Sequence, residues 1–194
     1  MRSATRSRQT KETSIRLALA LDSTPRVRIE TGIVMLDHLL SQFAFHSRLT
    51  LDLEARSLDA IRHHVIEDVA IVLGAAIDDA LGDRTRITRY GEVTLPMDDA
   101  LVRAAIDLGG RVYARTSLDL RVERIEDFET VMIPHIISSI AAHARATIHI
   151  DRLAGDDPHH VTEAAFKALG RACAQAWTFD QRFDGVASTK GMLV

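Results

Sequence analysis

Residues 63–67, with the sequence HHVIE, recur as HHVTE at residues 159–163, and this repeat is the main indication of how the chain folds. The two copies lie 96 positions apart, and the match continues through Gly74 and Gly170 to Ala80 and Ala176. Upstream, residues 38–50 match residues 135–147 at an offset of 97, and the one-residue change falls where a loop is expected. This period is far longer than that of a solenoid repeat, so the sequence predicts a duplicated α+β half.

The repeated segment has the residue types of a metal-binding helix. On a helix, residues four apart share a face, so His63 and Glu67 point the same way, whereas His64 is rotated by about 100°. One segment therefore offers a histidine and a carboxylate to one ion and a second histidine to another. Nitrogen and oxygen donors without thiolate suit zinc, manganese or iron. The alternative is a solvated helix start, and the second copy favours the metal site.

Composition and charge exclude several classes of protein. The chain has 194 residues, of which 46% are hydrophobic and 26% charged, as in ordinary globular domains. The net charge of −3 gives no reason to expect nucleic acid as a partner. No apolar run is long enough to cross a bilayer, and the basic N-terminal segment lacks the apolar core of a signal peptide. Cys173 is the only cysteine, which fits a reducing cytoplasm.

Hydrophobic periodicity predicts the order of strands and helices. We expect a first half at residues 1–93 and a second half at residues 94–194, within one catalytic unit. Residues 1–9 are expected to form a frayed tail, and residues 180–194 have weak periodicity. The expected strands are residues 14–21, 27–29, 49–53, 111–120 and 147–150, with further strand signals in residues 93–107, and the expected helices are residues 33–45, 62–82, 128–144 and 158–177.

Short segments spread over nearly the whole chain accompany the doubled histidine cluster. They are residues 10–13 (TKET), 36–38 (LDH), 81–83 (LGD), 89–91 (RYG), 96–98 (PMD), 110–111 (GR), 163–168 (EAAFKA) and 188–191 (STKG). In this order and spacing, the chain resembles the imidazoleglycerol-phosphate dehydratases of histidine biosynthesis. Because no phosphatase segment accompanies these motifs, it resembles the monofunctional form.

The resemblance implies the architecture and the partners. It implies an α+β fold of two similar halves, with helices layered between two mixed β-sheets, similar to the second domain of ribosomal protein S5. It also implies a cytoplasmic homo-oligomer of 24 subunits with active sites at subunit contacts. The expected partner is a small phosphorylated imidazole substrate, with no nucleic acid and no membrane.

The resemblance further implies a di-manganese site with two Mn²⁺ ions per subunit, held by two equivalent sets of four ligands, one set per half. The substrate imidazole is expected to bridge the ions as imidazolate. The electron-rich ring then expels the hydroxyl, and imidazole glycerol phosphate becomes imidazole acetol phosphate. The expected ligands are His38, His63, His64, Glu67, His135, His159, His160 and Glu163.

The substrate-contacting residues are also implied by the resemblance. Glu12 is the expected general acid/base, Glu67 and Glu163 are expected to be catalytic as well as ligands, and Gln42 is expected to contact the substrate. We expect Asp68 to orient a neighbouring histidine. The expected phosphate and substrate ligands are Arg89, Arg111, Lys167, Ser188, Thr189 and Lys190. The residues that depart from those common in the family are Val34, Ala70, Gly109 and Ala187.

Two other functions use similar residues. A dinuclear metal hydrolase would hold a phosphate ester at its ions. A metal-organising protein without activity would use the clusters to join subunits, but Glu12 and residues 188–190 would then have no purpose. The dehydratase hypothesis differs from the hydrolase in placing the imidazole at the ions and the phosphate on basic residues.

Overall fold

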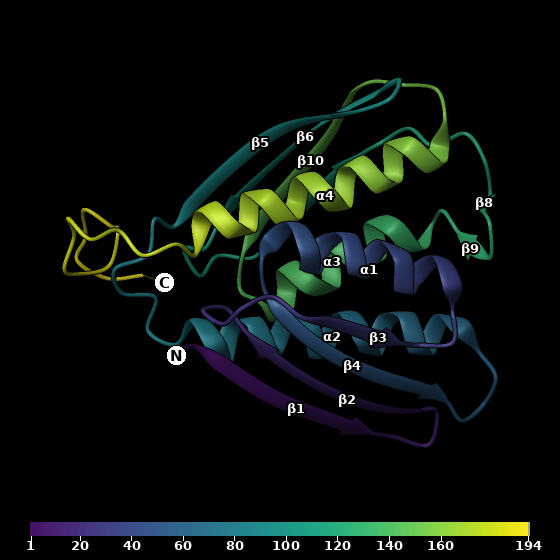
Figure 1. The fold of residues 1–194 in the computed structure, drawn as a ribbon, viewed down its shortest axis with the longest axis horizontal. Helices are drawn as coiled ribbons and strands as arrows, with labels where there is room; N and C mark the ends of the chain where they lie inside the picture. Colours follow the sequence, from purple (N-terminus) through teal and green to yellow (C-terminus); the bar gives the residue numbers. More distant parts are fainter. Residues whose placement is uncertain (194) are drawn as a thin grey trace.

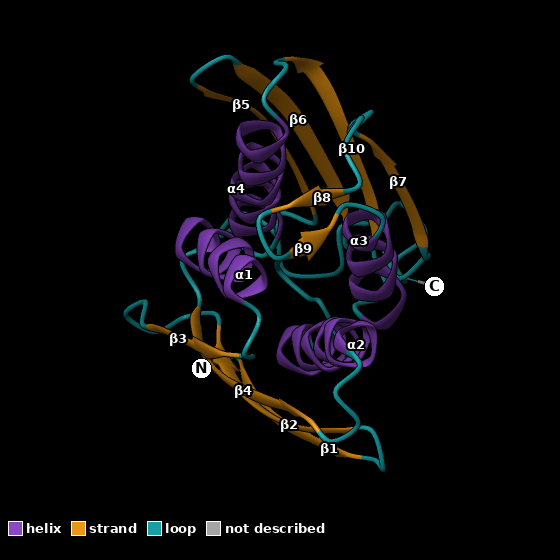
Figure 2. Ribbon diagram, turned by 90° about the vertical axis from the view of Figure 1, so that its right-hand side faces the viewer, coloured by secondary structure: helices purple, strands orange, loops and turns teal. Residues whose placement is uncertain are grey.

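Two four-stranded β-sheets enclose a layer of α-helices (Figure 1, Figure 2). The computed structural model describes residues 1–193. This is the predicted α+β architecture. The first half contains β1 (Ser3–Gln9), β2 (Thr13–Ala20), β3 (Val27–Glu30), α1 (Val34–Ser47), β4 (Thr50–Ser57) and α2 (Arg62–Leu81). The second half contains β5 (Tyr90–Met97), β6 (Ala100–Asp107), β7 (Tyr113–Ser117), a hairpin of β8 (Arg124–Ile125) and β9 (Phe128–Glu129), α3 (Met132–His143), β10 (Thr147–Ala154) and α4 (Pro158–Ala176).

The two sheets have the same topology. Their strand orders are β1-β2-β4-β3 and β5-β6-β10-β7. In the first sheet β4 pairs antiparallel with β2 and parallel with β3, and in the second β10 pairs in the same two ways with β6 and β7. This shared topology confirms the two similar halves. Because β5 begins at Tyr90, we place the start of the second half before that strand rather than at residue 94.

The N-terminal segment forms a strand, so the expectation of a frayed tail was wrong. β1 pairs antiparallel with β2, in a register that runs from Ser3 opposite Ala20 to Gln9 opposite Ser14. It lies at the edge of its sheet, and its side chains are mostly polar and exposed. Arginines on an edge strand discourage pairing with another chain. The alternation that marks a half-buried strand is therefore missing from β1.

The start of α3 also differs from the expected range. The predicted helix at residues 128–144 begins only at Met132, and the buried Phe128 belongs to β9. Pro134 lies in the first turn of α3, where a helix tolerates proline. The β8–β9 hairpin has no counterpart in the first half, so the repeat does not predict it.

Helices of opposite halves pack side by side in the central layer: α1 against α4, and α2 against α3 (Figure 2). Glycines allow this close packing. A Cβ atom added at Gly74 would lie 2.8 Å from the carbonyl oxygen of Ile140 in α3. A Cβ atom at Gly170 would lie 2.6 Å from the carbonyl oxygen of Phe43 in α1. Because the two glycines are equivalent in the repeat, the duplication preserves the close approach in both helix pairs.

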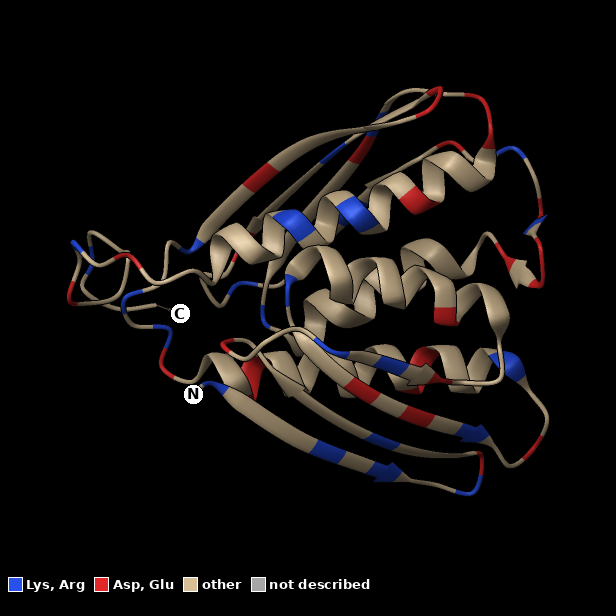
Figure 3. Ribbon diagram, viewed as in Figure 1, with Lys and Arg blue, Asp and Glu red and all other residues tan. Residues whose placement is uncertain are grey.

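Apolar side chains from the helices fill the space between the sheets. Leu36, Leu73, Ile137 and Leu169, one from each helix, are almost completely buried. Charged residues lie mainly on strands and loops, and α1 and α3 carry few of them (Figure 3). Within residues 1–193, no helix combines the length and the apolar character needed to cross a membrane.

Candidate metal centres and phosphate cavity

Three predicted ligands meet where α1 packs against α4, at a place that we call site A. Glu163 Oε2 lies 2.9 Å from His38 Nε2 and 3.2 Å from His159 Nε2. One ligand atom from each residue lies within 4.8 Å of the other two. The Glu163 side chain is only 8% exposed, so its carboxylate is shielded from water.

Site B is the equivalent place between α2 and α3, formed by His63, Glu67 and His135. Nε2 of His63 and Nε2 of His135 lie 3.6 and 3.7 Å from the Glu67 carboxylate, which is beyond hydrogen-bond distance. His135 Nε2 is buried and has no hydrogen-bond partner among residues 1–193. A buried nitrogen without a partner, next to a carboxylate, is suited to coordinate a divalent cation.

Both sites combine the two halves, which corrects the expectation of one ligand set per half. His38 of the first half joins His159 and Glu163 of the second. In the same way, His135 joins His63 and Glu67. The cause is the packing of α1 against α4 and of α2 against α3. The repeat in the sequence identifies equivalent residues, but it does not tell which helices face each other.

His64 and His160 belong to neither site within the chain. His64 Nδ1 donates a hydrogen bond to Asp59 at 2.6 Å, and His160 Nδ1 donates one to Asp99 at 2.7 Å. These bonds to carboxylates raise the pKa of both histidines. They also leave Nε2 of each ring without a hydrogen bond within residues 1–193, as in metal-binding histidines that a carboxylate orients, although Asp98 Oδ2 lies 3.6 Å from His160 Nε2. The eight predicted ligands therefore divide into two groups of three and two separate histidines.

Asp127 in the β8–β9 hairpin links two of the helices that carry ligands. Its carboxylate accepts hydrogen bonds from the backbone N–H groups of Val34 and Met35, in the first turn of α1. It also accepts a hydrogen bond from Arg62, the first residue of α2. A carboxylate at a helix N-terminus satisfies N–H groups that have no partner within the helix. Asp127 thus fixes α1 one turn before the site A ligand His38.

Lys167 lies at site A, apart from the other predicted phosphate ligands. Its Nζ atom is 2.7 Å from Glu163 Oε1 and 3.4 Å from the sulfur of Met97. Burial raises the pKa of the Glu163 carboxyl, but the hydrogen bonds from Lys167 and His38 outweigh burial and lower this pKa to about 2. Glu163 is therefore ionised at neutral pH, as a metal ligand must be.

Glu12, the predicted acid/base, and Gln42, the other residue predicted to contact the substrate, lie on different elements. Glu12 is on the turn between β1 and β2, with 54% of its side chain exposed. Its Oε2 atom lies 3.7 Å from His64 Nδ1, so a proton-transfer group sits beside a predicted ligand. Gln42 is half-buried on α1, one helical turn after His38.

The prediction that Asp68 orients a histidine was wrong. Asp68 accepts hydrogen bonds from the Thr13 hydroxyl and from Arg8, and so anchors β1 and β2 to α2. Asp59 and Asp99, which do hold histidines, were missed by the sequence analysis. Asp59 lies in the bend before α2 and Asp99 in the turn between β5 and β6, so neither has a signal in the hydrophobic pattern.

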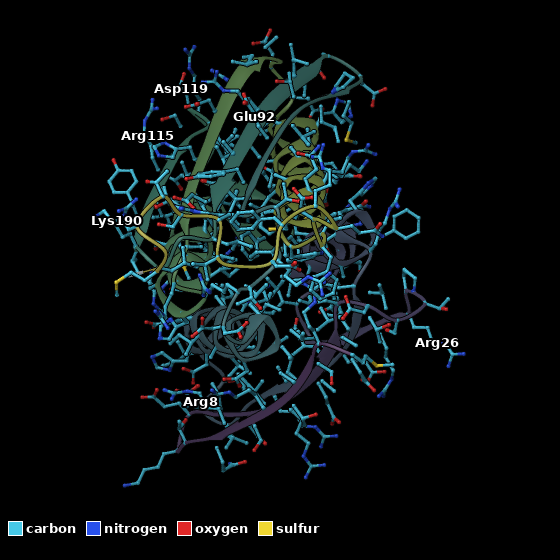
Figure 4. All side chains as sticks on the ribbon, turned by 90° about the vertical axis from the view of Figure 1, so that its left-hand side faces the viewer. Arg8, Arg26, Glu92, Arg115, Asp119 and Lys190 are labelled. Carbon is cyan, nitrogen blue, oxygen red and sulfur yellow. The ribbon has the colours of Figure 1, made fainter. Side chains whose placement is uncertain are left out.

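Arg89, Arg111 and residues 188–190 line one cavity of about 660 Å³. Most of the predicted phosphate ligands therefore lie together. The Arg111 guanidinium and the Lys190 ammonium make no ion pair or hydrogen bond within residues 1–193, so both are available to an anion. Figure 4 looks at the end of the molecule that carries Lys190 and the C-terminal tail.

Arg89 lines this cavity, but its guanidinium already has partners. It donates to Asp107 through Nε at 2.7 Å and Nη2 at 3.0 Å, and Nη1 donates to the Ala187 carbonyl at 2.6 Å. A Cβ atom added at Gly109 would lie 2.5 Å from Arg89 Nη2, so glycine there leaves room for the arginine. Arg89 therefore holds the segment that leads into residues 188–190.

The cavity and sites A and B lie at opposite ends of the folded molecule (Figure 1). His159 and Glu163 are near the first residue of α4, and the tail that lines the cavity follows its last residue. A helix of 19 residues extends about 28 Å at 1.5 Å per residue. A small substrate therefore cannot contact both the cavity and sites A and B of one chain.

Comparisons with known proteins indicate one family. The family model for imidazoleglycerol-phosphate dehydratase matches residues 31–173. The dehydratase of Acetivibrio thermocellus is 44% identical over 96% of both chains, and that of Moorella thermoacetica is 45% identical over 96% of this chain and 95% of its own. The dehydratase structure from Pyrococcus furiosus, in complex with (S)-C348, is 36% identical with a TM-score of 0.84, and covers 97% of this chain and 100% of its own.

The dehydratase structure from Staphylococcus aureus is 32% identical with a TM-score of 0.82, and covers 92% of this chain and 99% of its own. In the two curated dehydratases the identity of 44–45% extends over at least 95% of both chains. The chain therefore belongs to the imidazoleglycerol-phosphate dehydratase family, the hydro-lyases that dehydrate imidazoleglycerol phosphate in histidine biosynthesis.

Proposed function

We propose that the chain performs this dehydration with two manganese ions, one at site A and one at site B. The observation that carries the proposal is the pair of equivalent His-His-Glu groups. Their nitrogen and oxygen donors fit manganese, and the unpartnered Nε2 of His135 supports a cation at site B. Two cations bound at these sites would supply positive charge, which favours the imidazolate form of a substrate ring that lies between them.

His64 and His160 would complete the ligand sets of a neighbouring subunit. Asp59 and Asp99 hold Nδ1 of the two rings, and this leaves Nε2 of each ring for a ligand role. The separation of the metal sites from the phosphate cavity gives independent support for active sites at subunit contacts. We therefore propose a homo-oligomer of 24 subunits, the assembly that the family resemblance implies.

The remaining residues bind the substrate and move protons. Arg111 and Lys190 hold the substrate phosphate, together with the hydroxyl groups of Ser188 and Thr189. Glu12 protonates the hydroxyl that leaves as water from the carbon next to the ring, and then accepts the proton of the neighbouring carbon. The resulting enol tautomerises to the ketone of imidazole acetol phosphate.

A dinuclear hydrolase is the alternative activity for the same ions. Such an enzyme would hold the phosphate at the metal sites, whereas Arg111 and Lys190, which have no side-chain partner within residues 1–193, line the cavity at the other end of the molecule. The test is to incubate manganese-loaded protein with imidazoleglycerol phosphate. We expect imidazole acetol phosphate and no inorganic phosphate. Phosphate release without the ketone would contradict the dehydratase proposal.

A further inference from the structure

The two metal sites are equivalent in the repeat but differ in one neighbouring charge. At site A, Lys167 lies four residues after Glu163 on α4, and its Nζ atom is 2.7 Å from Glu163 Oε1. The equivalent position on α2, four residues after Glu67, is Ile71. Within residues 1–193, Glu67 forms no ion pair with a lysine or arginine. Beyond Arg62, the first residue of α2, the helix carries no lysine or arginine (Figure 3).

The lysine contacts the Glu163 oxygen that the histidines do not use. His38 and His159 approach Oε2, whereas Lys167 approaches Oε1. Lys167 can therefore stay in place while Oε2 coordinates an ion. The Glu163 and Lys167 side chains are only 8% and 19% exposed, so water and salt screen the positive charge weakly. Lys167 consequently places one positive charge beside an ion at site A that the equivalent Ile71 does not place at site B.

The hydrogen bonds within the sites act in the same direction. At site A, the contacts of 2.9 and 3.2 Å to Glu163 Oε2 must be exchanged for metal bonds. At site B, the corresponding distances to Glu67 are 3.6 and 3.7 Å, and His135 Nε2 gains its first partner when an ion binds. Both the charge and the existing contacts therefore favour an ion at site B.

We propose that the two sites fill in sequence, site B first and with higher affinity, and that Lys167 sets the weaker affinity of site A. The inference rests on the proposed function, because it assumes that both sites hold manganese. It follows that the protein has a state with one ion per chain at limiting manganese. A unit charge near a divalent ion in a partly shielded site is expected to change affinity by about tenfold or more.

The test is a manganese titration of metal-stripped full-length protein, followed by calorimetry or by the electron paramagnetic resonance of free manganese. We expect one tight and one weak class in the wild type. Lys167→Met should tighten the weak class about tenfold, and Lys167→Arg, which retains the charge, should leave it weak. His135→Ala should remove the tight class, and His38→Ala the weak class.

Ile71→Lys provides the reciprocal variant, since it adds a lysine four residues after Glu67 and should weaken the tight class. Two ions of equal affinity in the wild type, or a weak class unchanged in Lys167→Met, would overturn the sequential order and leave the proposed function standing. A wild-type chain that binds no manganese would instead overturn the proposed function. The circular dichroism spectrum of each variant confirms that it has folded.

Discussion

His38 Nε2 lies 2.9 Å from Glu163 Oε2, although 125 residues separate them in the sequence. The contact exists because α1 of the first half packs against α4 of the second. The reciprocal packing of α2 against α3 brings His135 to Glu67. Neither half alone brings together the three side chains of site A or of site B, so both proposed metal sites require the packing of the two halves.

The helix glycines should be sensitive to substitution by alanine. Gly170→Ala places a Cβ atom 2.6 Å from the Phe43 carbonyl oxygen, and a backbone atom cannot move aside as a flexible side chain does. Overpacking costs about 1–3 kcal/mol and outweighs the gain of about 1 kcal/mol in helix propensity. We therefore expect denaturant unfolding to show a lower free energy of unfolding for this variant.

Gly185→Ala is the matched control, because its added Cβ would meet only Phe183 side-chain atoms at 3.8 Å or more. It should leave the free energy of unfolding within about 0.5 kcal/mol of the wild type. Gly170→Ala protein that is more stable than the wild type would show that α1 and α4 are not closely packed, and would remove the explanation given for site A.

Glu12→Gln should separate proton transfer from metal binding. The substitution retains the shape of the side chain but removes a group that can exchange protons, so kcat should fall by about 100-fold or more. Manganese content should stay at the wild-type value, because Glu12 belongs to neither site A nor site B. Steady-state kinetics with elemental analysis measures both effects, and a variant with normal kcat would exclude Glu12 as the acid/base.

Lys190→Ala and Arg111→Ala should mainly raise KM. The phosphate does not react, so contacts to it bind the substrate and the transition state about equally. The control is Arg26→Ala, since Arg26 is exposed and lies away from Lys190 in Figure 4. Kinetics with imidazoleglycerol phosphate should show an unchanged KM for the control. If KM stays at the wild-type value in both cavity variants, the phosphate binds elsewhere.

Metal removal should shift the proposed 24-subunit oligomer toward smaller oligomers, because ions shared between subunits add their binding free energy to assembly. The pKa of His64 and of His160 is raised, chiefly by hydrogen bonds to Asp59 and Asp99. In the metal-free chain, His64 and His160 are therefore protonated at low pH, and they lose this proton as the pH rises through their raised pKa. Manganese competes with that proton, so acid should release the ion.

Light scattering measures this effect. As the pH is lowered with limiting manganese, we expect the decrease in oligomer size to begin above pH 6.5, the ordinary pKa of histidine. The decrease should be complete by about pH 5. Added manganese at neutral pH should restore the full particle. Metal-free protein that keeps its full size at neutral pH and at pH 5 would show that protein contacts alone hold the assembly.

The sequence predicts the helices and the central strands well, because residues such as Leu17 and Leu73 repeat at the period of a half-buried strand or an amphipathic helix. It does not predict β1, whose polar side chains face solvent at a sheet edge. The cytoplasmic location, expected from the single Cys173, stays a prediction.

For the sites, the repeat identifies the metal-binding residue types and the family resemblance supplies the full ligand set. The pairing of His38 with Glu163 depends on which helices face each other, and no local pattern encodes that choice. Asp127, which caps α1 from a hairpin 92 residues after Met35, is likewise a product of tertiary packing. Local periodicity therefore predicts elements, whereas contacts between the halves become visible only in the structure.

The most direct test of the two metal sites is the number of manganese ions bound per chain, measured by elemental analysis after removal of excess metal. We expect two ions in the wild type and one in His38→Ala or His135→Ala, because each variant loses one of the two sites. His149→Ala, whose ring lies against Tyr113, is the control and should keep two. If both ligand variants also keep two ions, sites A and B are not where manganese binds.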